Sequence, residues 1–365
     1  MLDISVLDSR EEIAKIDTQN VLGSVEALAD QCKDAWEKAS QIDVPDYYND
    51  IDKAVMCGMG GSGLGARVIE SVFFYDLNLP LTRVNDYNLP KFTDDHTLVI
   101  CSSYSGTTEE TIENAKQAIA KRAKWIAIGT GNTLIELAQK EGVPYYKIEP
   151  IFNPSNQPRM AIGYSVIGQL TLASKCGLFE LKGEDIYEAV LSMNKVKKLN
   201  NQDVPFSKNP AKQLAEKLKG RVILYIASRH LTGAIHTVNN QLNENAKNVS
   251  FDVQIPELNH HLLEGLKHPE ANTANLFVFF AASNLYPERI NARFEITRDV
   301  VSQNKIENYE YKLSSQTPLS QAFELIQFGG FVNLYLSVLY GQNPAPIPWV
   351  DYFKEKLGQP SGKKR

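Results

Sequence analysis

The sequence predicts an α/β protein built from two doubly wound domains, each a mostly parallel sheet flanked by helices. Short apolar runs bounded by turn residues alternate with windows of helical periodicity, which is typical of a parallel sheet with helices on both faces. This alternation occurs in both halves of the chain. A length of 365 residues with 43% hydrophobic residues is enough for two cores. We expect an N-terminal domain over residues 1–180 and a C-terminal domain over residues 181–365.

The individual elements follow from this alternation. A helical segment over residues 9–40 is expected to open the chain and to pack over the first domain. The strands expected after it are 54–57, 81–84, 98–101, 125–128 and 145–148. Residues 150–158 are rich in proline and asparagine and should be irregular, before a helix over 160–176. The second half has expected strands at 222–227, 249–253, 276–280 and 306–313 and a long helix over 318–340.

Composition excludes several classes of protein. The net charge of −5 argues against a nucleic-acid partner, which normally requires a basic face. No secretory signal is visible at the amino terminus, and the apolar stretches 276–286 and 328–340 are too short or too interrupted to span a bilayer. The cysteines are widely spaced with no histidine cluster beside them, which indicates a reduced, cytoplasmic protein without a metal site. They are Cys32, Cys57, Cys101 and Cys176.

Two loops of small residues carry the strongest functional signal. Gly58-Met-Gly-Gly-Ser-Gly63 and Ser102-Ser-Tyr-Ser-Gly-Thr-Thr108 each follow a short apolar strand and precede a helix. Glycine lets the backbone approach a ligand closely, and the helix that follows points free N–H groups at the same place. The hydroxyl groups of the second loop can donate hydrogen bonds to phosphate oxygens without adding a competing charge. The pair of loops therefore predicts one phosphate site.

Two other interpretations of these loops are possible. Gly58, Gly60 and Gly63 fit the G-x-G-x-x-G dinucleotide pattern, with Asp86 roughly where a ribose-binding acid is expected, and both loops can also be ordinary turns. The presence of a second loop favours a phosphomonoester. A terminal phosphate has more acceptor oxygens than one glycine-rich turn normally binds. The matching turn of the second half, residues 227–233, has one glycine and a bulky Arg-His pair. We therefore expect that this turn does not bind phosphate and that the ligand lies between the domains.

Across nearly its whole length the chain resembles the bifunctional phosphoglucose/phosphomannose isomerases, whose domains are sugar isomerase (SIS) domains. The matching segments are the two loops above, Pro158-Arg-Met-Ala-Ile-Gly163, Asn243-Glu-Asn-Ala-Lys247, Pro256-Glu-Leu-Asn-His260 and Pro346-Ile-Pro-Trp-Val-Asp-Tyr-Phe-Lys354. The resemblance implies reversible conversion of fructose 6-phosphate into glucose 6-phosphate and mannose 6-phosphate, as in glycolysis and gluconeogenesis. It also implies no metal or organic cofactor, and a homodimer whose active site is completed by a histidine of the neighbouring subunit.

The chemistry of such a reaction can be compared with the residues present. Aldose–ketose isomerisation moves a proton between C1 and C2 through an enediolate, so it needs a base and a positive charge near the oxyanion. The resemblance implies that Glu244 is the base and that Arg159, which keeps its charge at any physiological pH, stabilises the enediolate. From spacing alone, Glu244 could instead pair with Lys247 one helical turn on. The alternative for Arg159 is an ordinary interdomain salt bridge.

Two further residues are assigned to opening of the sugar ring. The resemblance implies that His260 protonates the ring oxygen and that Lys354 assists, and histidine suits this task because it titrates near neutrality. His261 falls where relatives more often carry asparagine, which leaves open which ring faces the substrate. Lys356 is the competitor of Lys354, because the register of the last helix is inferred.

The same resemblance and the loop chemistry give a set of phosphate ligands. They are Gly61, Ser62, Ser103, Ser105 and Thr108, with Thr107 expected to cap the following helix. Three rival functions remain at this stage. One is a non-catalytic regulator that binds phosphosugars, another is an NAD-dependent oxidoreductase, and the third is an amidating sugar isomerase, which normally needs a glutaminase domain that the amino terminus does not resemble.

Overall fold

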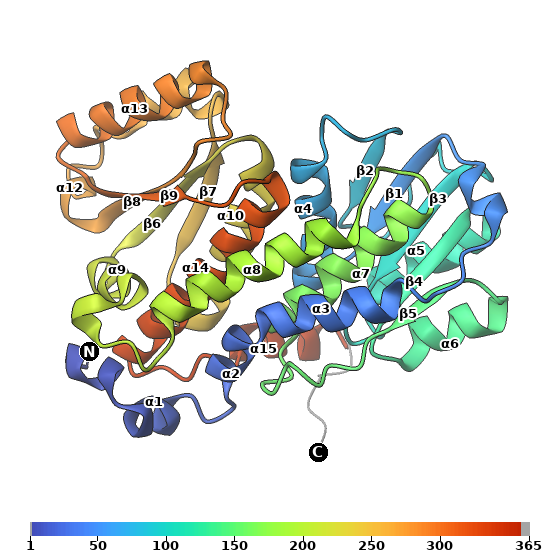
Figure 1. Cartoon of the computed structure of the whole chain (residues 1–365), viewed down its shortest axis with the longest axis horizontal. Coiled ribbons are helices and arrows are strands. Elements are labelled where there is room, and N and C mark those ends of the chain that lie inside the picture. The colour runs from blue at the N-terminus through green and yellow to red at the C-terminus, as the bar shows by residue number, and fades with distance from the viewer. Residues whose placement is uncertain (1, 359–365) are drawn as a thin grey trace. The chain divides into compact units, whose positions relative to one another are not determined.

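The structure is a computed structural model that describes residues 2–358, and it divides into two compact units. The five-stranded unit comprises Ala27–Tyr187 and the segment from Pro346 onward. The four-stranded unit comprises the chain up to Glu26 together with Glu188–Ala345. Each unit is a parallel sheet with helices packed around it (Figure 1). The fold class predicted from the sequence is confirmed.

The division differs from the predicted ranges, 1–180 and 181–365, at both ends of the chain. The first residues, up to Glu26, belong with the second half, and the segment from Pro346 onward belongs with the first half. Helix α8 (Gly183–Asn200) begins in one unit and ends in the other. Local patterns could not reveal this exchange of termini, because it depends on contacts between residues far apart in sequence.

The five-stranded unit has the sheet order β2-β1-β3-β4-β5, with every pairing parallel. Its central strand, β3, is buried along its whole length, which explains why the sequence shows a continuous apolar run there. The strands are β1 (Lys53–Cys57), β2 (Leu81–Val84), β3 (Thr97–Ser102), β4 (Lys124–Gly129) and β5 (Tyr145–Lys147). The helices are α3 (Leu28–Ala39), α4 (Leu64–Val72), α5 (Glu109–Ala120), α6 (Asn132–Glu141), α7 (Ile162–Lys175) and α15 (Pro348–Lys356).

The four-stranded unit has the order β7-β6-β8-β9, also parallel throughout. Helix α14 (Pro318–Leu339) is apolar and long enough to cross a membrane by length and composition, but all its residues after Pro318 are buried, as in the core helix of a globular protein. The strands are β6 (Val222–Ala227), β7 (Ser250–Gln254), β8 (Leu276–Ser283) and β9 (Glu307–Leu313). The other helices are α1 (Arg10–Ile16), α2 (Val21–Glu26), α9 (Pro210–Leu218), α10 (Thr232–Gln241), α11 (Leu262–Gly265), α12 (Asn272–Asn275) and α13 (Glu288–Gln303).

The predicted opening helix over residues 9–40 is broken into α1, α2 and α3. The carboxylate of Asp17 accepts hydrogen bonds from the N–H groups of Val21, at 2.8 Å, and Leu22, at 2.7 Å, and so caps the start of α2. Asn20 adopts a left-handed φ of 55°, which ends helical continuity before that point. The expectation that this segment packs over the first domain is wrong for α1 and α2, because they belong to the four-stranded unit.

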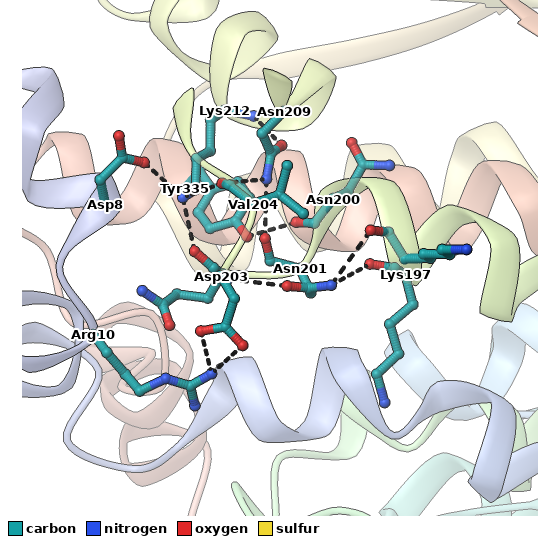
Figure 2. Close-up of polar contacts among 12 residues, drawn as sticks. Asp8, Arg10, Lys197, Asn200, Asn201, Asp203, Val204, Asn209, Lys212 and Tyr335 are labelled. Atoms are coloured by element: carbon teal, nitrogen blue, oxygen red, sulfur yellow. Dashed lines mark hydrogen bonds and ion pairs between the residues drawn. The ribbon is translucent and has the colours of Figure 1, made fainter. Parts of the chain in front are cut away.

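A buried lysine holds the start of the chain to the four-stranded unit (Figure 2). The ammonium group of Lys212 donates hydrogen bonds to Asp8 Oδ1 at 2.9 Å and to the carbonyl oxygens of Gln202 at 2.9 Å and Val204 at 2.8 Å. Its side chain is completely buried and lies over the ring of Tyr335, 5.6 Å from the centroid. Burial lowers the pKa of Lys212, and Asp8 offsets part of that effect. The segment before α1 is therefore anchored by a cation in the core.

Replacing this cation with an apolar side chain of similar length should weaken the anchor. We expect Lys212→Met to lower the free energy of unfolding by about 2–3 kcal/mol, because buried carbonyl groups and the partly exposed Asp8 lose their partner. The matched control is Lys208→Met at an exposed site nearby, which should change stability by less than about 0.5 kcal/mol. Urea unfolding of the full chain measures both. Equal effects of the two substitutions would contradict the anchoring role.

Candidate active site

The first loop predicted to bind phosphate follows β1. The turn η3 (Gly60–Gly63) is a short 3-10 helix that leads directly into α4, and Gly60 adopts a left-handed φ of 50°. A Cβ atom on Gly58 would lie 2.9 Å from the carbonyl oxygen of Ser62, so the loop folds back on itself too tightly for a side chain there. Backbone packing at the carboxyl end of the strand thus explains Gly58, and the left-handed φ explains Gly60.

The second loop follows β3 and ends at the amino terminus of α5. Ser105 is exposed and Thr108 is half-buried, whereas Ser103 is fully buried. The hydroxyl of Ser103 lies 2.8 Å from that of Thr108 and accepts a hydrogen bond from the N–H group of Gly106 at 3.1 Å. Thr108 is the N-cap residue of α5 but makes no side-chain capping bond, so its hydroxyl does not occupy the N–H groups of the first turn. Thr107 was expected to cap this helix; instead its hydroxyl donates to Ser105.

A hydrogen bond joins the two loops, as the prediction of a single site requires. The hydroxyl oxygen of Ser62, which is 8% exposed, accepts a bond from the N–H group of Tyr104 at 2.8 Å. Gln169 of α7 reinforces this contact, because its side-chain amide donates to the carbonyl oxygen of Ser62 at 3.0 Å and to the hydroxyl of Ser102 at 3.2 Å. The phosphate-loop candidates of the sequence therefore lie together in the five-stranded unit.

A third loop, after β4, packs against the second and was missed by sequence reasoning. Gly106, with φ of 70°, has its missing Cβ position only 1.9 Å from the carbonyl oxygen of Gly131. The side chain of Asn132 donates to the carbonyl oxygen of Ser105 at 2.8 Å, and that of Thr130 donates to the carbonyl oxygen of Tyr104 at 2.7 Å. The available signal was the run Gly129-Thr-Gly-Asn132 directly after a predicted strand, which is the same arrangement as in the first loop.

Arg159 lies beside the first loop. It belongs to the turn η4 (Pro158–Met160), is 2% exposed, and its Cα atom is 3.1 Å from the position that a Cβ atom on Gly61 would take. Its guanidinium group donates to the side-chain oxygen of Gln157 at 3.1 Å. The structure thus places the backbone of a buried arginine against the glycine loop, within one unit.

Glu244 is in the four-stranded unit, in an irregular helical turn. Residues Leu242–Ala246, labelled η7, form a π-helix at the end of α10, a feature that is often found at functional sites. Glu244 is half-buried there. The turn is held by Asn243, which exchanges hydrogen bonds with Ser250 of β7, and by Lys247, whose ammonium donates to the carbonyl oxygens of Asn343 and Pro344.

His260 is held by a different part of the same unit. It ends the turn η8 (Glu257–His260), which follows β7, and both His260 and His261 are exposed. The neighbouring Asn259 donates to the hydroxyl of Thr297 in α13 at 2.7 Å. Glu244 precedes β7 and His260 follows it, and a strand of 5 residues is about 16 Å long. The structure therefore anchors these two candidates to different elements, on either side of β7 along the chain.

The turn after β6 differs from its counterpart after β1. The ring of His230 is 7% exposed, and its Nε2 lies 2.9 Å from the side-chain oxygen of Gln321. Because Gln321 uses its amide N–H groups on Asn284 and Ser315, its oxygen is the acceptor and the histidine nitrogen is the donor. Burial lowers the pKa of His230. An aromatic ring with its own polar partner thus occupies this turn.

Helix α15 carries Lys354 and belongs to the five-stranded unit. Lys354 is half-buried, whereas Lys356 is exposed, with its ammonium nitrogen 5.5 Å from the centre of the Tyr352 ring. None of the described residues 348–356 of this helix is buried, and large apolar side chains here face solvent. These are Trp349 at 80%, Val350 at 39%, Tyr352 at 54%, Phe353 at 60% and, just after the helix, Leu357 at 51% exposure.

The fold and the paired loops define a SIS-domain protein. Residues 207–357 match the family model described as the bacterial phospho-glucose isomerase C-terminal SIS domain. In fold, the chain is similar to the crystal structure of a hypothetical protein from Thermus thermophilus, with a TM-score of 0.76 and 14% identity, covering 97% of this chain and 94% of that one. A glucose-6-phosphate isomerase like protein from the same organism has a TM-score of 0.63 and 17% identity, covering 96% of this chain and 100% of that one.

Sequence comparison narrows the class to one family. The chain is 35% identical over 339 residues to a bifunctional phosphoglucose/phosphomannose isomerase of Caldicellulosiruptor bescii, and the match covers 92% of this chain and 98% of the relative. The chain therefore belongs to the bifunctional phosphoglucose/phosphomannose isomerase family. The resemblance predicted from its motifs is confirmed.

The packing of Gly106 against the third loop gives a direct test of the loop geometry. We expect Gly106→Ala to abolish thermal stabilisation of the protein by inorganic phosphate, because the new Cβ forces the carbonyl of Gly131 and hence the second loop to move. The matched control is Gly142→Ala, which has a similar φ of 66° but open space around the missing Cβ. It should cost about 1 kcal/mol of stability while keeping the response to phosphate. Loss of that response in both variants would contradict this account.

Proposed function

We propose that the protein is an aldose–ketose isomerase that interconverts fructose 6-phosphate with glucose 6-phosphate and mannose 6-phosphate. The proton moves between C1 and C2 through an enediolate, carried by side chains without a metal or organic cofactor. The observation that supports this best is the arrangement of two interlocked phosphate loops with a buried arginine packed against one of them. Phosphate loops with an arginine in the neighbouring turn suit a phosphosugar that becomes an oxyanion during reaction.

The phosphate group is the anchor of the substrate. Ser105 and Thr108 present hydroxyl groups, and Gly61 and the first turn of α5 offer N–H groups. Ser62 accepts a bond from Tyr104, which leaves its own O–H proton to donate to the ligand. Ser103 orients Thr108 through their shared hydrogen bond. Neutral donors are sufficient here because the dipole of α5 adds positive potential.

Arg159 and Glu244 carry the central step of the proposed reaction. Glu244 acts as the base that moves the proton, and Arg159 stabilises the charge that develops on the enediolate. Glu244 lies in a π-turn, so it does not follow the regular α-helical spacing of the side chains of α10. Its half-burial partly shields the carboxylate from bulk water while leaving it open to a substrate.

His260 and Lys354 are proposed to open the sugar ring. A histidine can give and take a proton near neutral pH, and a lysine can stabilise the ring oxygen as it leaves. Of the competing pairs, Lys354 is favoured over Lys356, since the latter is exposed and lies over Tyr352. His260 and His261 are both exposed, so the assignment of His260 rests on the family motif.

We further propose a homodimer in which His260 of the neighbouring subunit completes the site. Within one subunit, Glu244 and His260 are anchored to different elements on either side of β7 along the chain. Helix α15, which carries Lys354, exposes Trp349 and Phe353, and large exposed aromatic side chains are typical of interfaces. A second copy of this chain is the partner that we propose to cover them.

The proposed setting is the cytoplasm, in the interconversion of hexose phosphates during glycolysis and gluconeogenesis. The alternative class, a regulator that only binds phosphosugars, would need the phosphate loops but neither Glu244 nor Arg159. The comparisons give no support to that class, because curated relatives of this chain are named as isomerases.

A coupled assay with fructose 6-phosphate in the presence of EDTA tests the activity, with glucose 6-phosphate and mannose 6-phosphate followed separately. We expect both products. Glu244→Gln should then lose about 10²–10⁴-fold in kcat while its KM changes little, because the amide keeps the shape but cannot accept the proton. The control is Glu216→Gln at an exposed site of α9, which should match the wild type. Full activity of Glu244→Gln would overturn the assignment of the base, and an inactive wild type that still binds the substrate would favour the regulator.

Mixing two inactive variants tests the shared site. Glu244→Gln and His260→Ala subunits, coexpressed, should regain activity, because one site of each mixed dimer combines two wild-type residues. Each variant alone should stay inactive. If the mixture is as inactive as its parents although mixed dimers form, then both residues act in the same subunit and the proposed arrangement is wrong.

A further inference from the structure

Tyr104 lies in the second phosphate loop but points its side chain away from solvent. The residue is 7% exposed, although Ser105 beside it is exposed. Its hydroxyl donates to the side-chain oxygen of Asn156 at 3.1 Å and accepts from the side-chain amide of Asn153 at 3.1 Å. Burial raises the pKa of the Tyr104 phenol, so the hydroxyl stays protonated and keeps both bonds near neutral pH. Both partners belong to the irregular segment that precedes Arg159.

The backbone of Tyr104 is held equally firmly. Its N–H group donates to Ser62 of the first loop at 2.8 Å, and its carbonyl oxygen accepts from the N–H group of Thr130 at 3.0 Å and from the hydroxyl of Thr130 at 2.7 Å. One residue therefore links all three loops at the carboxyl edge of the sheet to the segment over residues 153–157.

Hydrogen bonds continue from the Tyr104 hydroxyl to the arginine. The amide of Asn153, which binds the hydroxyl, also donates to the carbonyl oxygen of Gln157 at 3.0 Å. The side-chain oxygen of Gln157 accepts the bond from the guanidinium of Arg159 at 3.1 Å. Asn153 is 3% exposed and its own oxygen accepts from Ser155 at 3.0 Å, so its orientation is well determined.

We propose that the Tyr104 hydroxyl is a positioning group that sets the distance between the bound phosphate and the guanidinium of Arg159. The carbon chain of a hexose 6-phosphate limits how far C1 can lie from the phosphate, so a loop that binds the phosphate helps the reaction only if the arginine lies within that reach. Tyr104 couples these two requirements, because its backbone belongs to the phosphate loop and its hydroxyl to the arginine segment. This inference rests on the proposed function of Arg159.

The test is Tyr104→Phe, which removes the hydroxyl and keeps the ring. We expect kcat for fructose 6-phosphate to fall by about 10-fold or more, since small displacements of a catalytic group are costly. KM should change less than about threefold, because Ser105 and Thr108 are untouched. The matched control is Tyr48→Phe, another buried tyrosine of the five-stranded unit, whose hydroxyl donates to the carbonyl oxygen of Trp125 at 3.0 Å. It should leave both constants unchanged.

A double-mutant cycle separates positioning from a general structural effect. In an Arg159→Ala background, Tyr104→Phe should cause no further loss of kcat, because the group it positions is gone. An additional loss of the same size, or an unchanged kcat in the single variant, would overturn the inference. If Tyr104→Phe folds poorly, Asn156→Gly replaces it: glycine tolerates the φ of 51° at that residue, and only the acceptor for the hydroxyl is lost. That variant should lower kcat in the same direction, and wild-type kinetics would contradict the proposal.

An inactive wild-type enzyme would be a failure of the proposed function and would be recognised before any variant is made. An active wild type with a Tyr104→Phe variant of equal kcat would instead refute only the positioning role.

Discussion

The lack of space between the loops of the five-stranded unit is the constraint on which its site depends. Gly106 lies against the carbonyl of Gly131, with no room for a side chain, and Gly61 lies tightly against the backbone of Arg159. Because the loops are in such close contact, one loop cannot move without displacing its neighbour. The hydroxyl and N–H groups of these loops are consequently fixed with respect to one another, and for the proposed phosphate ligand this rigidity lowers the ordering cost of binding. Gln169 and Ser62 add hydrogen bonds across the same junction.

The two units use the same parallel-sheet plan for different purposes. After β1 the chain places a run of glycines that leads into a helix, whereas after β6 it places the ring of His230 and satisfies it with Gln321. The second unit carries a half-buried carboxylate, Glu244, in a π-turn. This difference between the two units agrees with the proposed reaction, in which one group of residues binds the phosphate and another transfers the proton.

Much of this arrangement could be predicted from the sequence because it is local. Strands appear as apolar runs, and the loops that follow them have small residues at neighbouring positions, so the sheet and the proximity of the two loops could both be predicted. Phosphate binding by these loops stays a prediction. The anchoring of the first residues by Lys212 could not be predicted from the sequence, because Asp8 and Lys212 are far apart in the chain and a single lysine forms no recognisable pattern. Tyr104 was overlooked for a related reason: its partners, Asn153 and Asn156, lie in a segment that has no regular structure to predict. The third loop was missed although its glycines were visible, since only the structure shows Asn132 bonded to Ser105.

Hydrogen exchange followed by mass spectrometry, with and without fructose 6-phosphate, tests the central claim most directly. Unphosphorylated fructose at the same concentration is the control. If the interlocked loops hold the phosphate, fructose 6-phosphate should slow exchange of the amides over residues 58–65 and 103–110, and fructose should not. Binding of fructose 6-phosphate that leaves exchange in both of these loops unchanged would contradict the account.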